Sequence, residues 1–155
     1  MITDEPLTEA TLLTAAAVPT AVIRHHGITM DDLRPLFDAG YSAIAASGAP
    51  IAGPAFALYT GDVSTRFDLE LGFPVTDPLT GPIGEVEPSE LPAGDVLVVS
   101  HLGGYDGLGP AWGGLFGAAA QRGLQPRGSF YEVYVTEPTP DTDPATLRTD
   151  LFIQV

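Results

Sequence analysis

The pattern of apolar and polar positions changes from the period of a strand to that of a helix twice along the chain, in the same order. Two runs rich in β-branched residues, Thr20–His26 and Asp95–Leu102, predict strands, and a glycine follows each of them. Beyond each glycine, apolar residues recur at helical spacing and form one face of a predicted helix. The first face carries Leu33, Phe37, Tyr41 and Ile44, and the second carries Leu108, Trp112, Leu115, Phe116 and Ala119.

Proline and glycine mark where each predicted helix begins and ends. Pro35 and Pro110 suit the first helical turn, where a missing N–H breaks no hydrogen bond. Gly48 and Gly123 follow the helical runs, as glycines at helix C-termini do. Two more strands are predicted after each helix, near 55–60 and 66–73 in the first half and near 129–136 and 147–155 in the second. The proline-rich loop 137–143 is expected to be exposed.

These two halves are copies of one unit. Shifting the sequence by 75 residues aligns 31–59 with 106–134 without a gap and gives eight identical pairs in 29 positions, where this composition would give roughly three by chance. We therefore predict an α+β protein in which a strand–helix–strand–strand module is duplicated in tandem, with a ligand cleft between the pseudo-symmetric halves. A single domain would span 1–155, with modules at about 11–75 and 91–155 and a linker at about 76–90.

Composition and charge restrict the partners that such a protein would have. The chain has 155 residues, 45% of them apolar, which suits a folded core and argues against disorder. It carries 20 acidic residues against 6 basic ones, all arginine, for a net charge of −14. That charge argues against nucleic-acid binding. Solubility is the favoured explanation of the charge, and attraction of cationic ligands is the alternative. The absence of cysteine excludes disulfides and gives no signal about the compartment. With no apolar run of membrane-spanning length and no basic leader, we expect a cytoplasmic protein without a membrane partner.

Glu132 is a lone carboxylate in an apolar strand, and its counterpart in the first copy is Ala57. Strand alternation places it on one face with Phe130, Tyr134 and Thr136. A buried, ionised carboxylate is costly unless it is paired. Three partners would serve: an internal donor, an incoming cation, or a proton held at a raised pKa. Glu132 is therefore the first candidate for a ligand contact, and for catalysis if the protein is an enzyme.

The second predicted helix combines glycines with aromatic side chains. Gly109, Gly113 and Gly117 lie four apart, and each costs about 0.5–1 kcal/mol of helix stability relative to alanine. Close packing of the helix on the sheet is the favoured explanation, and a helix that loosens to admit ligands is the alternative. Trp112, the one tryptophan, is a core residue or a cation–π pocket wall. Tyr105, in the turn before the helix, is a surface residue or overhangs a cleft.

The sequence shows no pattern for a metal, a nucleotide cofactor or a serine nucleophile. His25 and His26 are neighbours in a strand, so their side chains point to opposite faces. Ser100 and Ser129 lack the context of a catalytic triad. The glycine-rich stretch 103–117 lacks the lysine and the acidic residue of nucleotide-binding motifs. We therefore expect neither a metal nor a cofactor.

Several runs together resemble the GyrI-like family, also described as AraC-type effector-binding domains. They are Leu91–Val96, His101–Leu108 and Tyr131–Tyr134 in the second half, with Phe67–Val75 at the close of the first. The resemblance covers nearly the whole chain and implies two such modules with a ligand groove between them. It also implies a buried glutamate that contacts cationic aromatic ligands, and Glu132 matches that position. Tyr105, Trp112 and Tyr134 match pocket-wall positions. Since no helix-turn-helix region accompanies the chain, a stand-alone member is expected.

Three functional hypotheses follow from the residues and the resemblance. The first is a multidrug-binding protein for bulky, apolar, often cationic aromatic compounds, which sequesters toxins or senses ligands as the domains of transcription regulators do. Its ligand-binding residues would be Glu132, Tyr134, Trp112, Tyr105, Tyr59, Phe37, Tyr41 and Phe116. The second is a hydrolase of cyclopropane-containing electrophiles that uses Glu132 for proton transfer. The third is a protein-interaction role such as topoisomerase inhibition.

Overall fold

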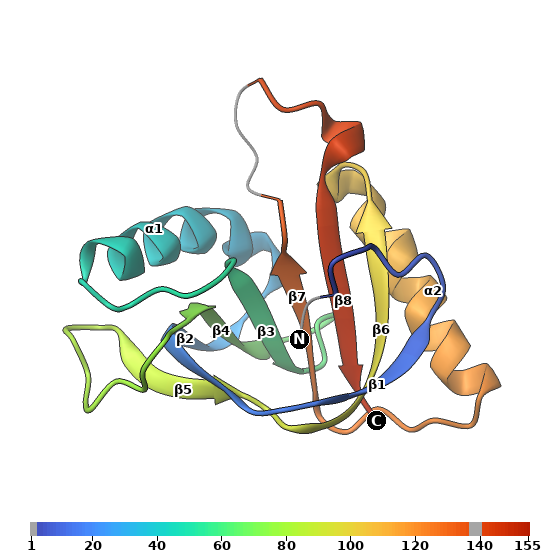
Figure 1. Cartoon of the computed structure of the whole chain (residues 1–155), viewed down its shortest axis with the longest axis horizontal. Helices are drawn as coiled ribbons and strands as arrows, with labels where there is room; N and C mark the ends of the chain where they lie inside the picture. The colour runs from blue at the N-terminus through green and yellow to red at the C-terminus, as the bar shows by residue number, and fades with distance from the viewer. Residues whose placement is uncertain (1–2, 137–140) are drawn as a thin grey trace. The chain divides into compact units, whose positions relative to one another are not determined.

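The computed structural model describes residues 3–136 and 141–155 and contains both predicted helices (Figure 1). Residues 137–140 of the predicted exposed loop lie outside the described residues. In chain order the elements are β1 (Thr11–Ala15), β2 (Val18–Ile28), α1 (Leu33–Ala46), β3 (Phe56–Gly61), β4 (Phe67–Pro74), β5 (Glu87–Leu91), β6 (Gly94–Leu102), α2 (Leu108–Gln121), β7 (Ser129–Tyr134) and β8 (Arg148–Gln154). Short 3₁₀ helices occupy Met30–Asp32, Tyr105–Gly107 and Pro144–Thr146.

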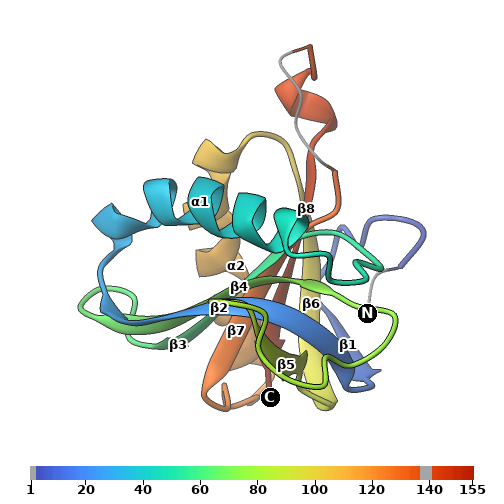
Figure 2. The same ribbon diagram turned by 90° about the vertical axis from the view of Figure 1, so that its left-hand side faces the viewer.

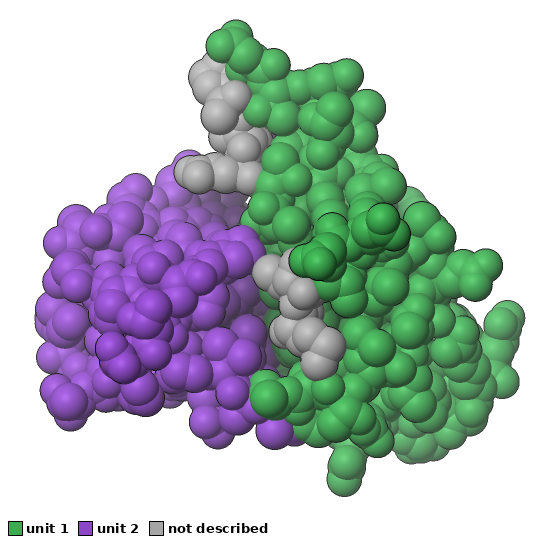
Figure 3. Space-filling model, in the orientation of Figure 1, with its two compact units in different colours: residues 1–16, 94–155 green, residues 17–93 purple. Residues whose placement is uncertain are grey.

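The chain folds into two compact units, residues 1–16 with 94–155 (unit 1) and residues 17–93 (unit 2) (Figure 3). In unit 2 the strands pair antiparallel in the order β3–β4–β2–β5, and α1 packs against β4 and β2 (Figure 2). In unit 1 the antiparallel order is β1–β6–β8–β7, and α2 packs against β6 and β8. The predicted strand–helix–strand–strand module is therefore confirmed in both copies, as β2–α1–β3–β4 and β6–α2–β7–β8.

In each unit, one outer strand comes from the segment that precedes the other module in the chain. β1 comes before β2 in the chain but pairs with β6, where Leu13 lies opposite Val96. β5 comes before β6 but pairs with β2, where Ser89 lies opposite Thr20. The sequence did not predict these strands, because each has only 5 residues and β5 carries two glutamates and a proline. β5 also begins within the segment expected to be a linker, 76–90.

A buried ion pair holds the N-terminal segment onto the rest of unit 1. Arg148 and Asp150 of β8 form two charge-assisted hydrogen bonds, of 3.0 and 2.9 Å. The same guanidinium donates to the backbone carbonyl of Thr3 at 2.9 Å. The Ser100 hydroxyl donates to Asp150 at 2.7 Å and accepts from the Leu7 N–H at 2.9 Å. These bonds explain why the beginning of the chain belongs with its second half.

Both helices end as their glycines predict. α1 stops at Ala46 and α2 at Gln121, and Gly48 and Gly123 follow with φ angles of 84° and 68°. Glycine is favoured in this left-handed region because it has no Cβ to clash with the backbone. No helix in the described part of the chain is long and apolar enough to cross a membrane.

Candidate functional site

Glu132 of β7 is buried, with only 6% of the residue exposed. Alternation along β7 turns it toward α2, while Tyr131 faces the other way and stacks on Phe152 of β8. The indole N–H of Trp112 donates to Glu132 Oε1 at 2.7 Å, and the Tyr134 hydroxyl donates to Oε2 at 2.6 Å. Each carboxylate oxygen therefore accepts a hydrogen bond from an aromatic side chain.

Both of these donors are neutral, so they would stabilise an ionised carboxylate without cancelling its charge. A hydrogen bond to a charged group contributes about 1.5–3 kcal/mol, which offsets part of the cost of burying the carboxylate. Of the three partners that the sequence suggested for Glu132, the structure shows an internal donor. An ionised Glu132 would still attract a cation that approached it.

Aromatic rings from α2, from β7 and from the turn before α2 pack next to this carboxylate. Tyr105 packs edge-on against Tyr134, with 5.9 Å between the ring centroids. Trp112, Phe116 and Phe130 contact one another, with centroids 5.8, 5.2 and 5.6 Å apart. Glu132 is hydrogen-bonded to one ring of each group. The Glu132 cluster is defined as Tyr105, Trp112, Phe116, Phe130, Glu132 and Tyr134.

The charge of Glu132 influences Tyr105, the most exposed member of the cluster. Burial raises the pKa of the Tyr105 hydroxyl above its ordinary value, and the negative charge of Glu132 raises that pKa further. Tyr105 is nevertheless 42% exposed. Tyr105 is therefore both accessible to solvent and within the electrostatic influence of the carboxylate, and its role as a residue that overhangs a ligand site stays a prediction.

The hydrogen bond between Trp112 and Glu132 is specific to the second copy of the module. The 75-residue shift places Phe37 opposite Trp112 and Ala57 opposite Glu132, so the first copy has neither the donor nor the acceptor. Substituting only one of the pair would leave a buried polar group without this partner, at a cost of about 1–3 kcal/mol. The two departures from the repeat are therefore explained by one interaction.

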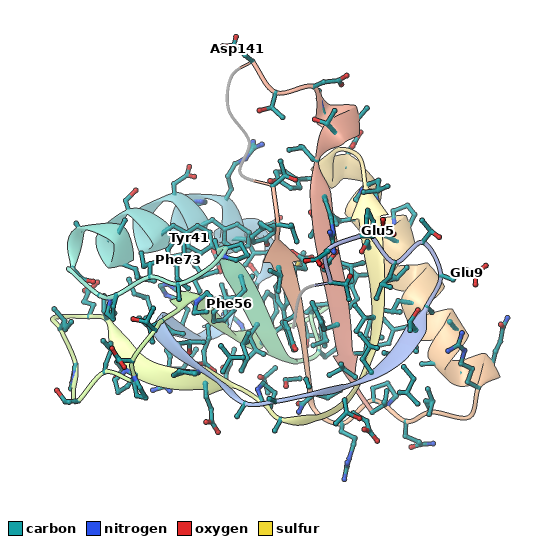
Figure 4. The ribbon with its side chains drawn as sticks, viewed as in Figure 1. Glu5, Glu9, Tyr41, Phe56, Phe73 and Asp141 are labelled. Carbon is teal, nitrogen blue, oxygen red and sulfur yellow. The ribbon has the colours of Figure 1, made fainter. Side chains whose placement is uncertain are left out.

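Three of the predicted ligand-binding residues belong to unit 2. Tyr41 of α1 packs edge-on against Phe73 at 5.5 Å and donates its hydroxyl proton to the Phe56 carbonyl at 2.8 Å (Figure 4). Phe37 packs against Tyr41, with 5.9 Å between ring centroids. Tyr59 of β3 is buried, with 4% exposed. A ligand-binding role for Phe37, Tyr41 and Tyr59 stays a prediction.

The glycines of α2 do not pack against the sheet, so the favoured explanation for them is wrong. A Cβ added at Gly109, Gly113 or Gly117 would meet no heavy atom of the described residues within 4 Å, apart from the helix's own nearby backbone. Leu115 and Ala119 are the buried residues of α2. The three glycines are offset from these positions around the helix and face away from the contact with the sheet.

A groove of about 450 Å³ lies along the opposite flank of α2 from Trp112. Its walls include Glu9 of the N-terminal segment, His101 at the end of β6, and Gly114, Ala118 and Arg122 on the helix. No member of the Glu132 cluster lines this groove. α2 therefore separates the groove from the site that the sequence predicted.

His101 is the residue near the site that the sequence did not single out. Its Nε2 lies 2.9 Å from the carbonyl oxygen of Gly104, in the turn that carries Tyr105. A histidine followed within six residues by Gly103, Gly104 and Gly107 was the available signal. Among the described residues, no three histidine, aspartate or glutamate side chains gather as metal ligands do.

Comparison with known protein families identifies one family. The profile of the GyrI-like small molecule binding domain matches residues 63–155. That range covers more than half of the chain and includes every member of the Glu132 cluster. No curated protein matches the chain in sequence.

Solved structures share the fold at low sequence identity. The crystal structure of the EcmrR C-terminal domain has a TM-score of 0.80 at 20% identity, over 96% of this chain and 97% of that one. The structure of SAV2435 bound to tetraphenylphosphonium has a TM-score of 0.67 at 11% identity, over 94% and 93%. A hydrolase encoded by lin2189 from Listeria innocua has a TM-score of 0.63 at 13% identity, over 97% and 93%. At these identities the likeness establishes the fold.

Proposed function

The chain belongs to the GyrI-like small-molecule-binding domain family, and on that premise we propose that it binds bulky aromatic cations beside Glu132. The coarser statement, a domain that binds small molecules, follows from the family itself. The choice of cations among small molecules rests on the residues of the Glu132 cluster.

The observation that carries the proposal is a buried carboxylate held by two neutral donors and bordered by aromatic rings. A cation beside Glu132 gains a Coulombic attraction that is stronger there than in water, because the surroundings are less polar. The rings of Tyr105 and Trp112 add cation–π contacts of about 0.5–2 kcal/mol each. A neutral or anionic ligand of the same shape gains neither contribution.

Two further observations support a cationic ligand. The net charge of −14 raises the local concentration of cations around the protein. SAV2435, which shares the fold, was solved with tetraphenylphosphonium, a cation with four phenyl rings. In a cell, such binding would sequester toxic cations, or would signal their presence where a separate DNA-binding partner took part.

The test is calorimetric titration with tetraphenylphosphonium of the original chain and of Glu132→Gln. Glutamine keeps the shape and an acceptor oxygen but removes the charge. Losing a desolvated charge partner costs about 2 kcal/mol or more, so the dissociation constant should rise roughly 30-fold. Glu90→Gln removes an exposed charge of β5 and is the matched control, for which we expect less than about a twofold change.

If Glu132→Gln binds the probe as tightly as the original chain, the charge-pairing role is wrong. If neither protein binds tetraphenylphosphonium, the class of ligand is wrong, although the family still requires a small molecule.

A hydrolase is the second candidate function, and one contact favours it. The Tyr134 hydroxyl lies 2.6 Å from Glu132, so the pair has the geometry for passing a proton to or from a bound substrate. Hydrolysis of a cyclopropane-containing electrophile by the original chain, lost in Glu132→Gln, would favour catalysis. Binding without product formation would leave the first proposal.

A further inference from the structure

The turn that carries Tyr105 is built around the imidazole ring of His101. The turn comprises residues 103–107 and links the end of β6 to the start of α2. A Cβ added at Gly107 would lie 2.7 Å from His101 Cε1, and one added at Gly103 would lie 3.7 Å from His101 Nε2. The histidine ring therefore occupies the space that side chains at these two positions would otherwise take.

Hydrogen bonds fix the ring to the turn and the turn to the sheet. His101 Nε2 lies 2.9 Å from the carbonyl oxygen of Gly104, and a carbonyl only accepts, so Nε2 carries the hydrogen and donates it. The same carbonyl accepts from the Gly107 N–H at 3.1 Å. The Gly103 N–H donates to the Leu147 carbonyl at 2.9 Å, just before β8. The backbone on both sides of Tyr105 is thereby held in place.

A short path leads from this turn to the carboxylate. Tyr105 follows Gly104 directly in the chain, and its ring packs against Tyr134, which donates to Glu132. Tyr105 itself is 42% exposed, so a large part of its surface is not packed against the protein. The place of its ring depends on the conformation of the turn.

The first copy of the module lacks this arrangement. The 75-residue shift places His26 opposite His101 and Met30 opposite Tyr105. The side chain of His26 is 75% exposed and lies 3.6 Å from Asp68. The enclosed histidine, the glycines around it and the tyrosine therefore occur together in the copy that also has Glu132.

We propose that His101 is a positioning residue that holds the Tyr105 ring beside Tyr134 and thereby sets the affinity for an aromatic cation. The effect on affinity rests on the proposed function, while the positioning of Tyr105 by His101 concerns the protein without ligand. His101 acts through Gly104 and Gly107 and does not itself contact the ligand.

The first experiment needs no ligand and follows the titration of the tyrosines by NMR in the full chain labelled with ¹³C at tyrosine Cζ. Burial and Glu132 raise the pKa of Tyr105, so a ring released into solvent titrates closer to its ordinary value. We therefore expect the pKa of Tyr105 to fall in His101→Ala. In His101→Gln, which keeps a side-chain N–H donor, the Tyr105 pKa should return to that of the original chain. His26→Ala, at the equivalent exposed position, should leave the Tyr105 pKa unchanged.

Tyr131 shows in the same spectra whether each variant is folded, because burial raises its pKa to about 12. A lower pKa of Tyr105 together with an unchanged pKa of Tyr131 supports the positioning role. An unchanged Tyr105 pKa in a folded His101→Ala protein overturns it. If His101→Ala unfolds, His101→Asn decides instead, since its shorter side chain cannot reach the Gly104 carbonyl: a Tyr105 pKa equal to that of the original chain overturns the role.

The second experiment measures tetraphenylphosphonium binding by calorimetry in His101→Ala, Tyr105→Ala and the double variant. If His101 acts through Tyr105, each single variant weakens binding by about five- to tenfold and the double variant weakens it no further. Effects that multiply in the double variant overturn the link to affinity. Absence of binding to the original chain refutes the proposed function and with it the affinity part, while the tyrosine titration still decides the positioning part.

Discussion

Glu132 and Trp112 are best understood as two ends of one hydrogen bond. A carboxylate in an apolar strand is costly unless donors reach it, and the donor at 2.7 Å comes from the position where the first copy has Phe37. The hydrogen bond from Trp112, a second residue that departs from the repeat, therefore offsets part of the cost of burying Glu132. The sequence identified both residues as candidates, but only the structure joined them.

Tyr131 is the neighbour of Glu132 and lies on the opposite face of β7. Its raised pKa lets us predict how the stability of the protein changes at high pH. Its ring stacks on Phe152 at 4.6 Å, and burial raises its pKa to about 12, against about 10 in the unfolded chain. Between these values the folded state holds a proton that the unfolded state has lost. The free energy of unfolding should therefore fall by roughly 2 kcal/mol as the pH rises from about 10 to about 12.

Urea denaturation at stepped pH checks this expectation. Tyr131→Phe keeps the stacked ring and removes the proton, so its free energy of unfolding should fall less over the same range. An equal fall in both proteins would mean that other groups cause the alkaline destabilisation.

Among the elements, α2 and β4 show that glycines in one chain have opposite roles. The glycines of α2 face open space, so nothing in the packing offsets their cost to the helix. Gly72 lies in the middle of its sheet, where an added Cβ would meet the carbonyl oxygen of Ala21 and, at 2.7 Å, Cγ1 of Val22. The four-residue spacing in the sequence indicated that the glycines of α2 lie along one side of the helix. It did not indicate which glycines of the chain the packing requires.

Alanine substitutions separate the two roles. Gly113→Ala and Gly117→Ala should each raise the free energy of unfolding by about 0.5–1 kcal/mol, because the helix gains propensity and no atom is displaced. Gly72→Ala should lower it by about 2 kcal/mol or more, because the neighbouring strand must move. Urea midpoints of the three variants measure both effects. A destabilised Gly113→Ala would mean that its face of α2 is covered in solution.

At the scale of the whole molecule, the excess of acid dominates the long-range electrostatics. The chain has 20 acidic and 6 basic residues, and some of the arginines are already engaged with acids. Arg148 pairs with Asp150 in the core, and Arg24 lies 3.0 Å from Glu87. The remaining field is negative, and it should draw cations toward the protein before any contact forms.

Salt should therefore weaken the binding of tetraphenylphosphonium. Raising NaCl from about 20 mM to about 500 mM shortens the Debye length to a few ångströms, and the dissociation constant should rise about three- to tenfold. Triphenylphosphine oxide, which is neutral and similarly aromatic, is the control ligand and should respond little. Equal salt responses of the two ligands would show that the net charge does not contribute to binding.

The sequence by itself determined the elements and the repeat. The periods of apolar residues, the prolines of the first helical turns and the glycines after the last turns are local features, so the duplicated module was predicted with boundaries close to those observed. Glu132 was also identified from the sequence, because a lone acid in an apolar strand departs from a local pattern. Tyr105, Trp112 and Tyr134 were predicted beside it, and the structure brings all three into one cluster with it.

Tertiary structure alone decided which distant groups meet. Trp112 and Glu132 are 20 positions apart, Ser100 and Asp150 are 50 apart, and no periodicity of the sequence relates either pair. β1 and β5 are short strands whose pairing depends on free sheet edges, so their exchange between the two units was not predictable. The enclosure of His101 by its glycines was missed for the same reason. Burial and hydrogen bonding are properties of the folded neighbourhood, whereas propensity and period are properties of the chain.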